Sequence, residues 1–420
     1  MISVDISKIK TQLLKLIHYG SGQFVNLIVP FLLSPYLILT CGESNFGKSA
    51  IGMTIAFFVI VFVDYGSDIL GVKEVSQNRY NKALLNHTLS KIVYSKIAMA
   101  VLFAIIYYVT LFFVDSSSTD KPLYLWSGTI FLAQIINPLW FFQGLEDFKN
   151  FSLLTIVSKI FYVLFCFLLV KKESDFIYIN LSYSLSVVIS GFVAYKILKS
   201  KYEIEFVTIK KKELFNYFNK HKTFAFSQIF TWFQLYAPIL IISFLGNAKL
   251  VGQFRLVDQI ISVFRTYIMM SFNFIYPKVC YEINQTYNRA IKNWSLYNLI
   301  NLSFVLLLLL LIYFFRVEIV KYYHVIEIKK IVSILAISLF YPIVFLLVNC
   351  FKQLFLALHF QKLFSIITII MSSLTILSIY FSFPYFELAG VYYSSIFVEL
   401  FTLIILIILS FKYKIIHTKK

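Results

Sequence analysis

The chain has 420 residues, of which 60% are hydrophobic and only 14% are charged, and its formal net charge is +18. Soluble domains average about 45 to 50% apolar and about 25% charged residues, so one soluble core of this length could not bury so much apolar surface. The composition therefore indicates a polytopic membrane protein. Because membrane spans would take up most of the chain, no room is left for a soluble enzyme domain.

The four cysteines are scattered through the sequence, with neither a C-x-x-C pair nor the spacing of metal ligands. This pattern predicts no disulfide framework and no metal site. We also expect no cofactor and no nucleic-acid partner. Most of the positive charge falls in short loops, where basic side chains face anionic lipid.

Twelve apolar runs predict twelve membrane spans. The first six fall at 13–40, 49–66, 92–114, 122–143, 151–170 and 177–198, and the second six at 223–245, 251–276, 294–315, 331–350, 363–384 and 389–411. Because hydrocarbon offers backbone groups no partner, each span should be an α-helix. The first run lacks a small-residue cleavage site, so we expect it to be a retained span. The predicted fold class is all-α, with six-helix lobes at 1–200 and 223–420 joined by a basic linker at 201–222.

The orientation follows from the basic residues in alternate loops. One set of loops carries 23 Lys and Arg residues and the other carries 8. Cytoplasmic loops are the basic ones, so both termini are predicted to be cytoplasmic. In the linker, Lys210, Lys211 and Lys212 precede Leu214 and Phe215, and we expect an amphipathic turn that lies on the anionic inner leaflet.

The segment from Gly42 to Ser49 matches the phosphate-loop pattern G-x-x-x-x-G-K-[ST]. That mechanism requires a preceding strand, a following helix and cytoplasmic nucleotide. Here the segment joins two predicted spans on the side opposite the basic loops. We therefore expect a short outward turn with two glycines.

The eighth predicted span carries three ionisable residues, Arg255, Asp258 and Arg265. At 100° per residue they lie within an arc of about 80°, so they form one polar stripe that could face a substrate path. The alternative is structural, because Asp258 could pair with Arg255 one turn away. Arg265 has no acid three or four residues away and would need a partner on another helix or a water-filled space.

Other spans also carry ionisable residues. Lys159 lies near the middle of the fifth span, where it would either serve the substrate or pair with an acid on a neighbouring helix. Glu399 and His18 are candidate carriers of a proton or cation, although an intramembrane histidine can equally be a packing residue. Asp64 lies near the cytoplasmic end of its span, where capping or pairing with loop cations competes with a coupling role.

Three segments of the chain point to a family. They are residues 137–146 (NPLWFFQGLE), Asp64–Gly66 with Val72–Ser76 and Arg79, and Gly246 with Val251–Gly252, Asp258–Gln259 and Pro277. They resemble segments of the Wzx-type O-antigen flippases, polysaccharide transporters of the multidrug/oligosaccharidyl-lipid/polysaccharide exporter superfamily. Residues 137–146 are similar to the signature of that family's fourth span.

The resemblance implies a non-enzymatic flippase in the cell inner membrane. It would move undecaprenyl-diphosphate-linked oligosaccharide repeat units to the outer leaflet by alternating access through a cationic cavity, coupled to a proton or sodium gradient. Arg255, Arg265 and Lys159 would attract the anionic head group, and Asp258, Glu399, His18 or Asp64 would carry the coupling ion. Membrane lipids, an O-antigen polymerase and a chain-length regulator are the other implied partners.

Two alternative functions remain open at the level of sequence. A multidrug exporter of the same superfamily would need an acidic cavity for lipophilic cations, whereas the deepest intramembrane charges here are mostly basic. A membrane polymerase of repeat units would need a large outward loop with catalytic residues. The longest outward segment, about Arg316 to Lys330, contains His324, Glu318 and Glu327 without a catalytic spacing.

Overall fold

The structure is a computed structural model that describes residues 6–113, 120–358 and 360–413. Within these ranges the secondary structure is helical and contains no strand, which confirms the predicted all-α class. The chain forms two compact units, unit 1 (Met1–Tyr236) and unit 2 (Ala237–Lys420). The division into lobes 1–200 and 223–420 with a linker at 201–222 stays a prediction.

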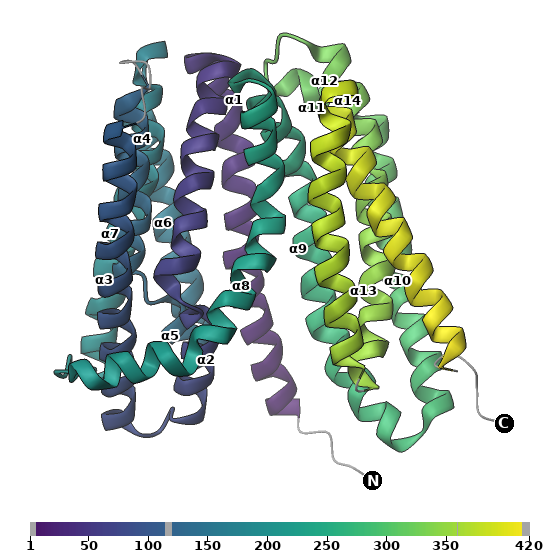
Figure 1. The fold of residues 1–420 in the computed structure, drawn as a ribbon. Coiled ribbons are helices and arrows are strands. Elements are labelled where there is room, and N and C mark those ends of the chain that lie inside the picture. The colour runs from purple at the N-terminus through teal and green to yellow at the C-terminus, as the bar shows by residue number, and fades with distance from the viewer. Residues whose placement is uncertain (1–5, 114–119, 359, 414–420) are drawn as a thin grey trace. The chain divides into compact units, whose positions relative to one another are not determined.

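Unit 1 is a helical bundle followed by the first part of the long helix α8 (Figure 1). Its elements are α1 (Ile6–Asp64), α2 (Ser67–Gln77), α3 (Lys82–Phe113), α4 (Lys121–Ala133), η1 (Gln134–Ile136), α5 (Leu139–Gly144), α6 (Phe148–Leu169), η2 (Glu173–Tyr178), α7 (Ile179–Tyr202) and α8 (Lys211–Leu245). Helices α4 and α6 each pack against both α1 and α7. The buried side chains of Trp140, Phe141 and Phe142 anchor the short α5 to this bundle.

Helix α1 contains a kink at Gly42, whose φ of 83° is in the left-handed region that favours glycine. The helix resumes at the next residue, so the break occupies a single position and is not the expected two-glycine turn. Lys48 forms an ion pair with Asp120 (2.8 Å), and the Ser49 hydroxyl donates to the carbonyl of Phe46. The segment that matches the phosphate-loop pattern is therefore helical and engaged in local contacts.

The predicted fourth span is interrupted. Helix α4 ends at Ala133, a 3₁₀ turn follows, and Asn137 is extended (φ −92°, ψ 101°) before α5 begins. Helix α7 approaches this break closely, because a Cβ at Gly191 would lie 2.6 Å from the carbonyl oxygen of Ile136. Within a membrane, irregular backbone is tolerated where it is buried in protein or lines a cavity.

The segment that leads to α8 docks on the end of unit 1 that carries α2 and α5. Residues 203–210 have no regular secondary structure, and the backbone amides of Glu205 and Val207 donate to side chains of α3. In Figure 1 the first turns of α8 then run across this end, roughly perpendicular to α7. The Tyr65 hydroxyl donates to the carbonyl of Phe218 and fastens these turns to α1. Further along, α8 contains Pro238.

Unit 2 is also helical. Its elements after α8 are α9 (Ala248–Gln285), α10 (Tyr287–Phe314), α11 (Arg316–Tyr322), α12 (Ile328–Ser338), α13 (Phe340–Ala357) and α14 (Gln361–Lys412). Helix α13 packs against both α9 and α14. Helix α14 breaks at Glu387, a non-glycine residue with φ of 47°.

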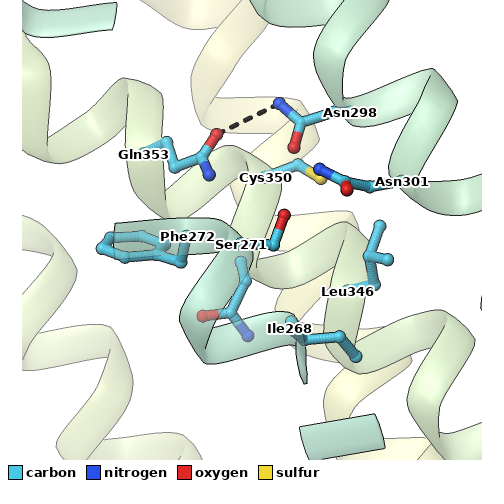
Figure 2. A pocket seen from close by; sticks show the side chains of 9 residues that line it. Ile268, Ser271, Phe272, Asn298, Asn301, Leu346, Cys350 and Gln353 are labelled. Carbon is cyan, nitrogen blue, oxygen red and sulfur yellow. Dashed lines mark hydrogen bonds between the residues drawn. The ribbon is translucent and has the colours of Figure 1, made fainter. Parts of the chain in front are cut away.

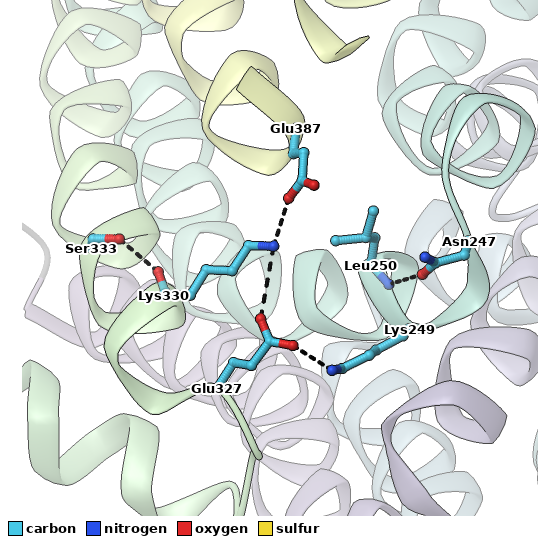
Figure 3. A network of polar contacts seen from close by, with 7 residues as sticks. All are labelled: Asn247, Lys249, Leu250, Glu327, Lys330, Ser333 and Glu387. Atoms are coloured by element: carbon cyan, nitrogen blue, oxygen red, sulfur yellow. Dashed lines mark hydrogen bonds and ion pairs between the residues drawn. The ribbon is translucent and has the colours of Figure 1, made fainter. Parts of the chain in front are cut away.

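A network of ion pairs surrounds this break in α14 (Figure 3). Lys330 binds the carboxylate of Glu387 (2.5 Å) and also contacts Glu327 (3.8 Å). Glu327 in turn accepts from Lys249 at the start of α9. The network thus ties together the first turns of α9 and α12 and the break in α14.

Eight helices among the described residues are long and apolar enough to cross a membrane. Two of them, Ile17–Asp64 and Lys362–Lys412, contain the breaks at Gly42 and Glu387, and each is far longer than the roughly 20 residues that one crossing needs. The chain is therefore a multi-pass membrane protein, as its composition predicts. The count of twelve spans and the cytoplasmic termini stay predictions.

Candidate functional site

Lys159 of α6 lies in the wall of a cavity of about 180 Å³ inside unit 1. The residue lies in the middle of a predicted membrane span, and its side chain is buried, with 8% of its surface exposed. The ammonium nitrogen is 5.2 Å from the centroid of the Tyr183 ring on α7, a cation–π distance.

The rest of the cavity wall contains polar and apolar side chains but no acidic one. It combines amide, hydroxyl, aromatic and aliphatic groups, from Gln23, Asn26, Asn137, Leu139, Phe151, Thr155, Ser158, Tyr183, Val187 and Ser190. The hydroxyls of Thr155 and Ser190 donate to backbone carbonyls, so their remaining lone pairs can accept hydrogen bonds. Amides and hydroxyls that both donate and accept suit a ligand rich in hydroxyl groups, and an ammonium group suits an anion.

A hydrogen-bonded chain runs from this cavity to a buried ion pair. The Asn137 amide donates to the Gln134 side chain (3.1 Å), and the Gln134 amide donates to the Asp64 carboxylate (3.1 Å). Asp64 also binds the ammonium of Lys96 (2.8 Å), whose side chain is only 1% exposed. The partner of Asp64 is therefore a lysine from inside the third predicted span and not a loop cation.

In unit 2, the stripe on α9 contains an unexpected pair. Arg265 donates to the Asp258 carboxylate (2.7 Å), which lies seven residues earlier on the same helix. The alternative considered from the sequence paired Asp258 with Arg255, whereas the structure pairs it with Arg265. The expectation that Arg265 needs a partner on another helix or in water is wrong. Two helical turns rise about 10.5 Å, a distance that the long arginine side chain, the hydrogen bond and the aspartate side chain span together along the helix surface.

Glu399 lies half-buried in the second part of α14, within electrostatic reach of Lys352 and Tyr341. Lys352 belongs to α13, and its ammonium lies over the rings of Phe272 and Phe364. Unit 2 thus places its buried carboxylates near basic partners. Glu399 and Asp258 belong to different helices of that unit.

His18 lies near the start of the described part of α1. Its backbone carbonyl accepts hydrogen bonds from the hydroxyls of Ser21 and Ser152. These contacts tie α1 to α6 through the main chain and involve no imidazole nitrogen. The role of the His18 side chain as an ion carrier stays a prediction.

Unit 2 also contains a small pocket lined by amides (Figure 2). Its volume is about 10 Å³, which is room for one water molecule and too little for a sugar ring. The Asn298 amide donates to Gln353 across it (3.0 Å), and Asn301 accepts from the Tyr267 hydroxyl. No group of three His, Cys, Asp or Glu residues that could hold a metal ion occurs in the described parts of either unit.

The sequence did not single out the cavity amides or Lys96 as site residues, for different reasons. Lys96 interrupts the apolar run 92–114, so its burial could be inferred from hydropathy alone. Gln23, Asn26 and Asn137 are uncharged, and polar uncharged residues in spans are too common to single out. Their convergence with Lys159 depends on how the helices are rotated.

A family model described as polysaccharide biosynthesis protein matches residues 13–279, more than half of the chain. The chain belongs to this family. The resemblance expected from the three sequence segments is thereby confirmed at the level of the family.

Two curated relatives are each named "Putative O-antigen transporter". The one from Escherichia coli (strain K12) is 25% identical over 276 residues, which are 63% of this chain and 63% of the relative. The one from Shigella dysenteriae is 21% identical over 283 residues, or 64% of this chain and 68% of the relative. The match thus spans less than two thirds of the Escherichia coli relative's length.

Solved structures of related fold cover nearly the whole chain. The lipid II flippase MurJ in an inward closed conformation has a TM-score of 0.70 at 15% identity, over 96% of this chain and 87% of that one. A multidrug resistance MATE family transporter of the MOP superfamily, facing inward, has a TM-score of 0.65 at 13% identity, over 94% of both chains. At these identities the likeness shows the fold alone.

Proposed function

We propose that the protein is a flippase that moves undecaprenyl-diphosphate-linked oligosaccharide repeat units from the inner to the outer leaflet of the bacterial inner membrane. Twelve spans with cytoplasmic termini would present the basic loops to the inner leaflet. Family membership and the names of the relatives support a transporter and not an enzyme. A polymerase of the same repeat units has no support in the described residues.

The observation that carries the proposal is the buried ammonium of Lys159 in a cavity wall of amides and hydroxyls. A charge inside a membrane span is costly, and such residues usually serve a substrate or ion pathway. An ammonium attracts a diphosphate or an acidic sugar, and the neutral polar groups match sugar hydroxyls. Because none of the described lining residues is acidic, the cavity does not suit lipophilic cations, which argues against a multidrug exporter.

In this proposal Arg255 and Arg265 on α9 also attract the anionic head group, and a proton or sodium gradient drives transport. Asp64, Asp258, Glu399 and His18 are the candidate coupling residues. Membrane lipids surround the transporter, and an O-antigen polymerase and a chain-length regulator act on the units that it delivers. Arg265 is paired with Asp258, so an anionic substrate must displace the Asp258 carboxylate before it can bind this arginine.

The test replaces Lys159 with methionine, which keeps the length of the side chain and removes its charge. Vesicles that contain only the purified protein are loaded with an undecaprenyl-diphosphate-linked oligosaccharide, and its movement between leaflets is followed. We expect Lys159→Met to reduce the rate at least tenfold, because the anionic head group loses its buried counter-charge. The matched control is Lys149→Met on the exposed first turn of the same helix, which should transport normally. Equal rates in both variants would contradict the role of the cavity.

A further inference from the structure

Five charged side chains gather at the end of unit 1 that carries α2, and their charges do not cancel. Lys96 pairs with Asp64 (2.8 Å), and Lys91 pairs with Glu74 (2.8 Å). Asp68, in the first turn of α2, is the third carboxyl group, and electrostatic interactions connect it with both Asp64 and Lys96. Three carboxylates face two ammonium groups, so this charge cluster has a net charge of −1 when all of its members are ionised.

The first turns of α8 cover the charge cluster with Tyr217. This side chain is only 4% exposed, and its hydroxyl has no hydrogen-bond partner among the described residues. The hydroxyl interacts electrostatically with the carboxylates of Glu74, Asp64 and Asp68. A buried phenol without a partner is costly, and it can either donate to a carboxylate or accept from a protonated carboxyl group. The unpartnered hydroxyl of Tyr217 lies beside a cluster with one excess negative charge, and this combination indicates that the cluster binds a cation or a proton.

The charges around Asp68 favour a proton. Burial, followed by the negative charge of Asp64, raises the pKa of Asp68, and the ammonium of Lys96 offsets part of this rise. The ring of His221 lies 4.8 Å from that of Tyr217, but burial lowers the pKa of His221 and keeps its imidazole neutral at pH 7. The imidazole of His221 therefore adds no positive charge to the cluster. Across the described residues there is also no group of carboxylates arranged to hold a metal ion.

We propose that Asp68 is a proton-binding site, with the Tyr217 hydroxyl as its hydrogen-bond partner, and that this proton is the ion coupled to transport. The carboxylate takes the proton from a hydronium ion in the adjacent water and becomes a neutral carboxyl group. The net charge of the cluster then changes from −1 to zero. The coupling role depends on the proposed function, whereas the binding of the proton does not.

Two contacts connect this site to the rest of unit 1. Asp64 belongs both to the charge cluster and to the hydrogen-bonded chain that reaches the Lys159 cavity through Gln134 and Asn137. On the other side, Tyr65 holds the segment of α8 that contains Tyr217 through its bond to Phe218. A change in the charge at Asp68 therefore acts both on the cavity wall and on the attachment of α8.

The first test measures proton binding on the purified full-length protein in detergent, without any substrate. A pH titration followed by infrared difference spectroscopy detects the carbonyl stretch of a protonated carboxyl group. We expect Asp68→Asn to lose one titrating band. The matched control Glu205→Gln, on the exposed segment before α8, should keep it. Tyr217→Phe should lower the midpoint by about one pH unit, because the protonated carboxyl group loses the hydroxyl that accepts its hydrogen bond.

Two outcomes of the titration would overturn the proposal. One is an unchanged band in Asp68→Asn. The other is a band that responds to sodium chloride at constant pH, which would make the site a sodium site.

The second test measures coupling in vesicles that contain an undecaprenyl-diphosphate-linked oligosaccharide with a fluorescent terminal sugar, quenched from outside with dithionite. A pH gradient should change the rate for the wild type and for Glu205→Gln, and it should have no effect in Asp68→Asn. Gradient dependence that persists in Asp68→Asn would refute the coupling role. If the wild type moves no lipid at all, the proposed function fails, while the result of the titration is unaffected.

Discussion

The two units treat buried charge differently. Unit 1 places the ammonium of Lys159 in the wall of a cavity of about 180 Å³, among amides and hydroxyls. Unit 2 holds Arg265 against Asp258, and its amide pocket has only about 10 Å³. Unit 1 thus offers a buried cation beside a cavity, where a ligand that brings negative charge can be received. In unit 2 the same ligand would compete with a carboxylate that is already bound.

The difference also separates two kinds of buried pair. In unit 1 the side chain of Lys96 is only 1% exposed and that of Asp64 is 14% exposed, and hydrogen bonds link Asp64 to the break in the predicted fourth span. Arg265 and Asp258 retain side-chain exposures of 24% and 14% and lie along one helix. Water reaches the second pair more easily, so the loss of one partner there should be less costly.

The largest effect is expected from Lys96→Met, which leaves the Asp64 carboxylate buried without its counter-charge. The free energy of unfolding in detergent should fall by about 3–5 kcal/mol, the usual cost of removing one partner of a buried pair. Denaturant titration of the purified protein measures it. The double variant Asp64→Asn/Lys96→Met should recover most of the loss, because no isolated charge remains. A double variant as unstable as the single one would mean that packing and not charge dominates here.

A smaller effect is expected from Asp258→Asn, which leaves Arg265 with a neutral amide. The loss should be about 2 kcal/mol, the range for a hydrogen bond to a charged group. The same titration compares it with Arg255→Gln, one turn earlier on α9 and outside the pair. If Arg255→Gln is as destabilising as Asp258→Asn, the pairing of Asp258 with Arg265 does not hold in solution.

The smallest effect is expected at the network around the break in α14. Glu387→Gln removes the partner of Lys330, but both side chains are more than a third exposed. The stability should change by less than about 1 kcal/mol, and added salt should abolish the difference from the wild type. Lys329→Gln, a neighbouring exposed lysine, serves as the control. A salt-independent loss several times larger would show that this network behaves like the buried pair of unit 1.

Hydropathy predicts the helices well, because the absence of backbone partners in hydrocarbon leaves few alternatives to a helix. Its failures have local causes. The break at Gly42 occupies one residue, and the composition of the segment could not distinguish this from a turn. The partner of Arg265 lies beyond the spacing of three or four residues at which helix neighbours are normally sought, yet the side chain is long enough to reach it.

The candidate site is less accessible to sequence reasoning than the fold. Lys159 and Lys96 are conspicuous in apolar runs, so their identity as unusual residues follows from hydropathy. Whether each faces a cavity or a carboxylate depends on helix rotation, which the nearly uniform apolar surface of these spans does not encode. The convergence of Asp64, Gln134 and Asn137 also depends on the break in the fourth span, which its apolar pattern does not reveal.

Pro238 has a consequence for the helix that joins the two units. It lies within α8, directly after the position at which unit 1 ends and unit 2 begins. A proline has no amide proton to donate, and its ring crowds the carbonyl four residues earlier, so the helix loses one of its internal bonds at this point. A helix commonly bends at such a gap in its hydrogen bonding. The connecting helix therefore carries a built-in weak point, and the segment before it carries Tyr217.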